Sequence, residues 1–404
     1  MFGKTWRLFQ MMRTPVRSLV FLFWVYEFAY SLVSVFVQVF LYQKFTDLSF
    51  NIIATMFLYT GIMVGFCIPG YVASLWRVNI KYGFASSFVI LAGSLFYLLN
   101  VASLQAAFLA MFLWGIGQGV FWLTVNTFEL SETKDNERDF YSSMLNAGGQ
   151  VLGLFGPACA TALIWLSSVL HLGTFTLLFT VTPFIYLLGF LCFQGIQDYR
   201  PPRIVWADIK HFFADRKNQA AQLYTVGTGF QQILGITIVP LATLLILGTA
   251  LRVGVYDTVF AVFSAFCVLL LAQYRTPSNR LLIYGLSIFG IIAATLWLGF
   301  ALTFTALVGY TVIHSFLSPI KNVSSHVIDL QVMETGRKET DFYATMLLRD
   351  LFLWLWRCLG GLAFLVAAHF LESQKSLLTG GLYLLAGAFA FTYLSAVIFI
   401  KIRN

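Results

Sequence analysis

The sequence predicts an all-α polytopic membrane protein with twelve transmembrane helices, arranged as two pseudo-symmetric six-helix bundles. Two observations lead to this prediction. First, 59% of the 404 residues are hydrophobic and only 10% are charged, whereas a soluble domain carries about 25% charged residues. Second, the chain repeats itself at an offset of half its length. Apolar stretches of about 20 residues, enough to cross a bilayer, fill nearly the whole sequence.

The repeat is clearest in one seven-residue motif. Residues 139–145 read DFYSSML and residues 341–347 read DFYATML, 202 residues apart in a chain of 404. A weaker echo at the same offset joins Tyr82-Gly83 to Tyr284-Gly285. A period of this length is far longer than that of a solenoid repeat. The chain therefore consists of two copies of one unit.

The elements follow from these patterns in chain order. Residues 1–17 are basic and aromatic, which predicts a short helix on the membrane surface that Pro15 ends before the first span. All spans should be helices, because open strands and loops cannot satisfy their backbone groups in lipid. The twelve predicted spans cover roughly residues 18–42, 50–74, 80–100, 104–128, 142–166, 172–195, 220–248, 254–273, 280–300, 302–328, 343–369 and 379–400.

The longest connection between predicted spans links the two copies and contains Pro201-Pro202. It repeats the basic and aromatic character of the N-terminal segment, so we expect each bundle to begin with a surface helix. The predicted domains are an N-terminal bundle at residues 1–195, a cytoplasmic linker at 196–219 and a C-terminal bundle at 220–404.

The distribution of Lys and Arg predicts the orientation. With the N-terminus in the cytoplasm, 19 Lys and Arg residues of the loops and termini fall inside and 3 fall outside. This asymmetry follows the positive-inside rule, and an even number of spans places both termini in the cytoplasm. The rule also accounts for the net charge of +8 without a nucleic-acid partner. The compact loops favour a bacterial inner membrane.

The sequence lacks the patterns of several catalytic classes. Its five histidines are scattered, and it has no His-Glu-x-x-His motif, no phosphate-cradling glycine loop and no nucleophile elbow. The five cysteines lie in apolar runs without paired spacing. We therefore expect no enzyme activity, no catalytic residue, no metal site and no cofactor. The absence of an ATP-binding loop also argues against a primary pump.

The six-plus-six arrangement, the central loop and the parallel repeat resemble the major facilitator superfamily of secondary transporters. That family's loop between spans two and three usually reads Gly-x-x-x-Asp-Arg-x-Gly-Arg-Lys; here Gly70 is kept, but Ser74 stands in place of the acid. Gly156-Pro157 is similar to a Gly-Pro element of the fifth span that is often associated with exporters. The resemblance implies two halves related by an axis along the membrane normal, with substrate between them near the midplane.

Polar side chains inside spans indicate a pathway or a partner, because they are unfavourable in lipid. Glu27, Ser31, Ser34 and Gln38 of the first span recur at spacings of three and four, which places them on one helical face. We expect Glu27, close to mid-membrane, to carry a coupling proton, with His314 as the other candidate. The alternative is that Glu27 only pairs with a neighbouring helix.

The fourth, seventh and tenth spans carry further polar positions. In the resembled fold these spans and the first line the central cavity, so their polar side chains are candidates for binding substrate. For the tryptophans, simple packing is the alternative. The predicted substrate-binding residues on the first, fourth, seventh and tenth spans are Gln38, Gln118, Trp122, Asn126, Gln231, His314 and Lys321.

The eleventh span carries Arg349, Asp350 and Arg357, where the fifth span has uncharged residues. One charge at a helix centre costs about 2.5 kcal/mol or more, so each needs compensation. Arg357, near the middle, is predicted to hold an anionic or zwitterionic solute, because its planar fork matches a carboxylate or phosphate. Lys321, Asp350 and Arg349 are alternatively a structural network. We assign a gating or ion-pairing role to Asp350, Arg349, Asp139 and Asp341.

Together these patterns predict a proton-coupled secondary active transporter of a small organic anion or zwitterion, working by alternating access as a monomer in the lipid bilayer. The alternative is an exporter or flippase of amphipathic compounds or lipids, which the aromatic residues and the Gly-Pro element fit. A non-transporting receptor or scaffold is the third reading, but it leaves Glu27 and Arg357 unexplained.

Overall fold

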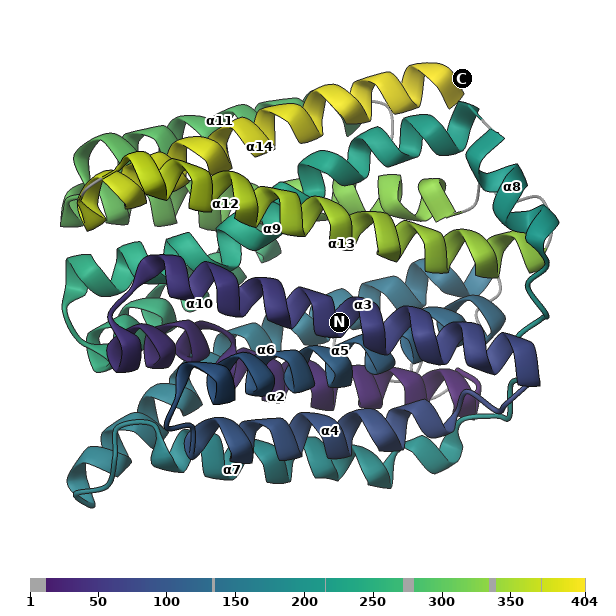
Figure 1. Ribbon diagram of the computed structural model, residues 1–404, viewed down its shortest axis with the longest axis horizontal. Helices are drawn as coiled ribbons and strands as arrows, with labels where there is room; N and C mark the ends of the chain where they lie inside the picture. Colours follow the sequence, from purple (N-terminus) through teal and green to yellow (C-terminus); the bar gives the residue numbers. More distant parts are fainter. Residues whose placement is uncertain are drawn as a thin grey trace. The chain divides into compact units, whose positions relative to one another are not determined.

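The computed structural model describes most of the chain, and all regular structure in the described residues is helical (Figure 1). The predicted surface helix at residues 1–11 lies outside the described part. The described residues are 12–132, 135–214, 216–271, 280–333, 339–371 and 373–403.

Twelve long helices and three short ones make up this part of the chain. They are α2 (Thr14–Phe45), α3 (Leu48–Trp76), α4 (Tyr82–Leu99), α5 (Leu104–Glu132), α6 (Asp135–Val169), α7 (Thr176–Leu187), the 3₁₀ turns η1 (Leu188–Leu191) and η2 (Phe193–Gly195), α8 (Trp206–Ala214), α9 (Arg216–Leu247), α10 (Ala250–Leu271), α11 (Arg280–Ala301), α12 (Phe304–Met333), α13 (Glu339–Phe370) and α14 (Gln374–Arg403).

Ten of the described helices are long and apolar enough to cross a membrane, and the chain is an integral membrane protein. The helices α10 and α12 are not among these ten, although each overlaps a predicted span. Every predicted span overlaps one of the helices α2–α7 and α9–α14. The short helix α8 lies within the predicted linker, where the sequence indicated a surface helix.

Local sequence explains where several helices begin. Pro15 lies in the first turn of α2, where its missing N–H is not needed. The Ser103 hydroxyl accepts a hydrogen bond from the Ala106 N–H at 3.2 Å before α5, and the Thr303 hydroxyl accepts one from the Ala306 N–H at 3.3 Å before α12. Both are N-caps, and they lie 200 residues apart. The repeat seen in the sequence therefore extends to helix capping.

The contacts divide the chain into two compact units. Unit 1 comprises Met1–Ser34 and Thr60–Arg203, and unit 2 comprises Val35–Tyr59 and Ile204–Asn404. Residues 35–59, which end α2 and begin α3, are therefore described with unit 2. The predicted domain limits of 195 and 220 stay a prediction.

Within unit 1, α4 runs beside both α5 and α7 (Figure 1). Glycines bring α3 and α5 close together: a Cβ atom on Gly61 or Gly65 would overlap backbone atoms of α5, and one on Gly119 would overlap the backbone at Ile62. Such small residues let helix backbones approach closely in membranes. One face of α5 thus packs against α3, and another face contacts α2, where Tyr26 stacks on Phe121.

Within unit 2, α9 packs against α13 and α14, and α11 runs beside α14 (Figure 1). Gly227 of α9 faces Thr392 of α14, and Gly229 faces α13. A Cβ atom on Gly229 would lie 2.7 Å from the Trp356 Cβ and 3.0 Å from the Arg357 backbone nitrogen. Gly229 thus sets how closely Arg357 approaches α9.

The turn between α3 and α4 is tied to the segment that follows η2. The buried Ser74 hydroxyl donates to the Pro202 carbonyl at 2.7 Å, and the Ile80 N–H donates to the Tyr199 carbonyl at 3.0 Å. Ser74 is the residue that stands where the resembled loop has an acid. Here its hydroxyl anchors the end of α3 to the segment that leads toward α8.

One surface ion pair supports the same turn. The Lys81 Nζ lies 3.5 Å from an Asp198 carboxylate oxygen. A hydrogen bond from the Asn79 side chain, together with Lys81, holds the pKa of the exposed Asp198 below its ordinary value. Exposed pairs of this kind contribute little to stability, so this ion pair adds little beyond the buried hydrogen bonds of the turn.

Candidate functional site

A buried guanidinium forms the polar centre of unit 2. Arg357 of α13 is only 7% exposed. Its Nε donates a hydrogen bond to the Gln232 Oε1 of α9 at 2.7 Å, and its Cζ lies 4.4 Å from the centre of the Tyr59 ring. Its Nη1 is buried and has no hydrogen-bond partner among the described residues. We call Arg357, Gln232 and Tyr59 the unit 2 centre.

The partners of Arg357 determine which part of the guanidinium remains for a ligand. A guanidinium presents five N–H donors in a planar fork. Gln232 occupies the Nε donor, and the Tyr59 ring covers one face in a cation–π contact. The edge that carries Nη1 is left without an acceptor. A carboxylate or phosphate oxygen at this edge would form a charge-assisted hydrogen bond.

Asp350 lies seven residues before Arg357 on α13, about 10.5 Å along the helix axis. It interacts electrostatically with Arg357 and Arg349, but its Oδ2 is buried without a hydrogen-bond partner among the described residues. No salt bridge joins Asp350 to Arg357 in the described part of the chain. Asp350 therefore offsets some of the cationic charge without occupying the Arg357 fork.

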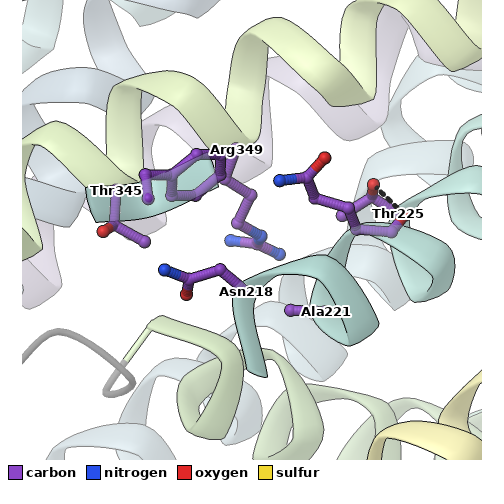
Figure 2. A pocket seen from close by; sticks show the side chains of 7 residues that line it. Asn218, Ala221, Thr225, Thr345 and Arg349 are labelled. Carbon is purple, nitrogen blue, oxygen red and sulfur yellow. Dashed lines mark hydrogen bonds between the residues drawn. The ribbon is translucent and has the colours of Figure 1, made fainter. Parts of the chain in front are cut away.

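Arg349 lies in a separate small pocket, where α9 and α13 begin. Figure 2 shows its guanidinium pointing from α13 toward Asn218 and Ala221 of α9. The Thr225 hydroxyl, also at this pocket, donates to the Gln222 carbonyl at 2.7 Å. The pocket is lined by Phe212, Asn218, Ala221, Gln222, Thr225, Thr345 and Arg349. The two arginines of α13 thus lie in different surroundings: Arg357 contacts Gln232 and Tyr59, and Arg349 lines this pocket.

The tenth predicted span places its two candidates in aromatic surroundings. The Lys321 Nζ lies 5.3 Å from the centre of the Phe389 ring of α14. The His314 ring stacks on Tyr310, with ring centres 5.4 Å apart, and it interacts electrostatically with Lys321. Gln231, on α9 beside the Gln232 of the unit 2 centre, is half-buried.

Gln38 belongs to a fully buried hydrogen-bond network of unit 2. Its Nε2 donates to the Thr55 hydroxyl at 3.1 Å, and its main-chain carbonyl accepts a bond from the Asn51 amide at 2.8 Å. The hydroxyls of Thr55 and Thr237 are 3.0 Å apart. These four side chains are at most 1% exposed. In this structure the network around Gln38 joins α2, α3 and α9, and the role of Gln38 in substrate binding stays a prediction.

A lone carboxylate forms the polar centre of unit 1. Glu27 of α2 is half-buried, and no hydrogen bond or ion pair of its carboxylate occurs within the described residues. It lies close enough to Tyr26 and Tyr186 to interact with them electrostatically. Unlike Arg357, it has no hydrogen-bond partner among the described residues of its own unit.

Aromatic pairs between α2 and α5 flank Glu27. The ring centres of Tyr30 and Trp114 are 6.1 Å apart, and those of Phe23 and Trp122 are 6.0 Å apart. Gln118, halfway between the two tryptophans, is 5% exposed, and its Nε2 is buried without a partner among the described residues. We call Glu27, Gln118 and these four rings the unit 1 centre. Asn126, one turn beyond Trp122, is half-buried.

The polar stripe predicted on the first span does not face one environment. The Ser31 hydroxyl donates to the Phe28 carbonyl at 2.8 Å, and Ser31 lies against Gly156 of α6. Glu27 lies beside the aromatic pairs with α5, while Gln38 is buried in the unit 2 network. The four-residue spacing indicated the common helical face, but not that three different helices cover it.

Two predicted gating residues, Asp139 and Asp341, cannot be placed in the site, and sequence reasoning missed two residues, Tyr59 and Asp257. Asp139 lies in α6 and Asp341 in α13, but their side chains lie outside the described residues. Tyr59, which stacks on Arg357, was not singled out because an aromatic residue in an apolar run carries no signal. Asp257 of α10 was also missed; an acid in an apolar run is a signal that the sequence contains. Its neighbour Tyr256 donates to the Thr311 hydroxyl at 2.6 Å.

Comparisons with known proteins support the fold. No protein-family model matches the sequence, and no curated protein matches it at a significant level. Solved structures do match. A bacterial homologue of the human lysosomal transporter Spinster is 14% identical, with a TM-score of 0.62 over 96% of this chain and 97% of that chain.

Two further structures are similar over almost their whole length. The human organic anion transporter MFSD10 is 13% identical, with a TM-score of 0.65 over 95% of this chain and 99% of that one. The nucleoside transporter NupG is 14% identical, with a TM-score of 0.62 over 96% and 99%. The chain therefore has the fold of major facilitator superfamily transporters, as its sequence pattern suggested.

Proposed function

We propose that the chain is a secondary active transporter that moves a small organic anion or zwitterion by alternating access, coupled to protons. The observation that carries this proposal is the unit 2 centre. Arg357 is 7% exposed, its Nε is held by Gln232, and its Nη1 is buried without a partner among the described residues. A buried donor without an acceptor costs about 1–3 kcal/mol, and more when it is charged.

A bound anion would remove that cost. Ionisable residues inside membrane spans typically mark substrate or ion pathways, and an uncharged residue would be more stable there. The orientation imposed by Gln232 and Tyr59 prepares the fork in advance, so little side-chain entropy is lost when the ligand binds. One similar structure is that of an organic anion transporter, which agrees with this class. Another is a nucleoside transporter, so the fold alone does not select the substrate.

Glu27 is the residue that we propose to carry the proton. Its carboxylate has no hydrogen-bond or ion-pair partner within the described residues. A carboxyl group that the protein leaves without a partner is available to take up and release a proton in step with the transport cycle. His314, packed on Tyr310, is the second candidate for this role.

The proposed architecture follows the sequence pattern. All twelve long helices cross the membrane as two six-helix bundles, and α10 and α12 are included because their positions match the repeat. Both termini lie in the cytoplasm, in agreement with the distribution of Lys and Arg. We propose a monomer in a bacterial inner membrane. The gating roles of Asp350, Arg349, Asp139 and Asp341 and the substrate roles of Lys321, Gln118, Trp122, Asn126, Gln231 and Gln38 are part of the same proposal.

A thermal-shift screen tests this function. Purified protein is heated with small carboxylates, phosphates and amino acids, because a ligand of the folded state raises its apparent stability by mass action. The solutes that stabilise the protein are then tested for uptake into proteoliposomes with and without a proton gradient. We expect an anionic or zwitterionic solute to be taken up and Arg357→Lys to abolish uptake. Uptake of neutral solutes only, unchanged in Arg357→Lys, would contradict the proposal.

An exporter or flippase of amphipathic compounds is the second candidate function. The aromatic pairs Tyr30–Trp114 and Phe23–Trp122 favour it, because ring faces suit apolar ligands. Transport in inverted vesicles compared with right-side-out vesicles distinguishes the two. Proton-driven accumulation in inverted vesicles only would indicate export.

A further inference from the structure

We propose that the unit 1 centre is a binding site for an organic ammonium group. This inference rests on the proposed function, because it narrows the substrate class from an anion or zwitterion to a zwitterion that carries an ammonium group. It assigns the aromatic rings around Glu27 a role beyond packing, and it assigns Glu27 a ligand as well as a proton.

Glu27 and Gln118 occupy matching positions on α2 and α5. On α2, Glu27 is four residues after Phe23 and three before Tyr30; on α5, Gln118 is four residues from both Trp114 and Trp122. Tyr30 contacts Trp114, and Phe23 contacts Trp122. Residues three or four apart share a helical face. Glu27 and Gln118 therefore lie at the same level, between the two aromatic pairs.

Most of the helical sequence of unit 1 carries no basic side chain. Residues 18–34, 60–76, 82–128 and 141–195 of unit 1 contain Glu27 but no Lys or Arg. These ranges thus supply no fixed cation for this carboxylate, and Arg17 of α2 is ten residues from Glu27, about 15 Å along the helix axis. A carboxylate in a membrane interior is stabilised by pairing or hydrogen bonding. When Glu27 is ionised, its partner must come from outside these ranges, and a cationic ligand meets this requirement.

The groups around Glu27 suit an ammonium group. The faces of Trp and Tyr attract ammonium groups through cation–π interactions, and Trp is the strongest. Trp122 and Tyr30 are half-buried, so they retain accessible surface. The Gln118 Nε2 is buried without an acceptor among the described residues. Rotation of the amide lets Gln118 offer either an N–H or a carbonyl oxygen, the second of which accepts from an ammonium group.

The same groups argue against an inorganic cation. Metal ions such as Ca²⁺ and Mg²⁺ take six or more oxygen ligands, whereas this centre offers one carboxylate and one amide between four rings. Groups of His, Cys, Asp and Glu suited to a metal do not occur among the described residues. An alkylammonium group needs fewer oxygen partners and gains from the ring faces, so it fits this composition best.

Thermal unfolding with matched small probes tests the proposal. Butylammonium chloride, sodium butyrate and uncharged 1-butanol are compared at constant ionic strength on the purified full-length protein. We expect butylammonium, and not 1-butanol, to raise the melting temperature of the wild type. In Glu27→Gln, which keeps the shape of the side chain, the concentration that gives the same shift should rise about tenfold or more, since charge-assisted bonds are the strong ones.

Asp257→Asn is the matched control, because it makes the same acid-to-amide change in an apolar run of the other unit. It should leave the butylammonium response unchanged. A second pair of variants tests the rings: Trp122→Phe should retain most of the response, and Trp122→Leu should weaken it about threefold or more, as expected for a cation–π contact. This pair keeps the proposal testable if Glu27→Gln does not fold.

The outcomes separate this inference from the proposed function. A wild type that butylammonium does not stabilise, or a response equal in the wild type, Glu27→Gln and Trp122→Leu, overturns the ammonium site. A butyrate response that is absent, or that survives in Arg357→Gln, contradicts the anion site of the proposed function. In that case a butylammonium response that depends on Glu27 still supports the present inference.

Discussion

The two units hold their buried charges in different ways. Arg357 of unit 2 has an amide on its Nε, a ring on one face and an acid two turns away. Glu27 of unit 1 lies among aromatic rings, and its carboxylate has no ion pair among the described residues. A charge that its own unit partly compensates can stay ionised and fixed in position. A charge without such compensation needs a proton or a ligand. The difference suggests that Arg357 orients substrate while Glu27 exchanges ions.

The largest expected effect comes from Arg357→Lys. The substitution keeps the charge but removes the planar fork and its bond to Gln232, and the two side chains are not interchangeable at such a site. We expect uptake of the solute found by thermal shift to fall about 100-fold, equivalent to about 2.7 kcal/mol. Initial rates in proteoliposomes measure this. Uptake at the wild-type rate would show that the fork plays no part and that the two centres are not specialised.

Glu27→Gln should separate proton coupling from solute movement. The variant cannot release a proton at this position, so an imposed pH gradient should no longer drive accumulation. Exchange of labelled for unlabelled solute should continue at a rate reduced about tenfold, because the amide loses the charge-assisted contact with the ammonium group but leaves the Arg357 fork in place. A pH-sensitive dye inside proteoliposomes reports the proton movement. If solute-stimulated proton flux survives, His314 becomes the candidate.

Gly229→Ala tests whether the position of Arg357 depends on the close approach of α9 and α13. The added Cβ would lie 2.7 Å from the Trp356 Cβ and 3.0 Å from the Arg357 nitrogen. Overpacking of this kind costs about 1–3 kcal/mol, so thermal stability should fall. Gly235→Ala on the same helix is the control, because nothing lies within 4 Å of its Cβ position. Equal stability of the two variants would contradict the packing account.

Thr237→Val should have a smaller effect, confined to unit 2. It removes the hydroxyl that lies 3.0 Å from the Thr55 hydroxyl in the Gln38 network while preserving the shape of the side chain. Hydrogen bonds between membrane helices contribute about 0.6 kcal/mol on average. A fall in melting temperature of that order, with substrate affinity unchanged, would place Gln38 in a structural role. A selective loss of affinity would favour the predicted substrate role.

The smallest effect is expected at the surface of unit 1. The pKa of Asp198 is lowered, chiefly by the Asn79 hydrogen bond and also by Lys81. A lowered pKa stabilises the folded state above the unfolded pKa, and this stability is lost as pH falls through the folded value. Because the Asn79 hydrogen bond remains and the ion pair is exposed, Lys81→Gln should leave the melting temperature at neutral pH nearly unchanged. A large loss of stability there would show that the ion pair matters more than its exposure suggests.

Some features of the fold could be predicted from the sequence because they depend on periodicity. Each long apolar stretch overlaps a helix, and the caps at Ser103 and Thr303 follow the repeat. Four-residue spacing also placed Glu27 and Gln118 on helical faces. The helix ends were less accurate: the sixth predicted span ends in the turns η1 and η2 rather than in an α-helix.

The partners of each polar residue could not be predicted, because they depend on which helices meet. Gln38 and Glu27 lie on the same face of α2 by their spacing. Gln38 is buried in a hydrogen-bond network, whereas Glu27 has no partner among the described residues. Tyr59 contacts Arg357 although the two are nearly 300 residues apart in the sequence. Spacing along one helix contains no information about such long-range contacts.

Solute-driven proton movement in proteoliposomes tests the central claim most directly. A solute that stabilises the purified protein is added outside vesicles that contain the wild type, Glu27→Gln or Arg357→Lys, and the internal pH is recorded. The wild type should move protons with the solute, Glu27→Gln should move the solute without protons, and Arg357→Lys should move neither. Solute flux that moves no protons in the wild type and is equal in all three proteins would contradict the account.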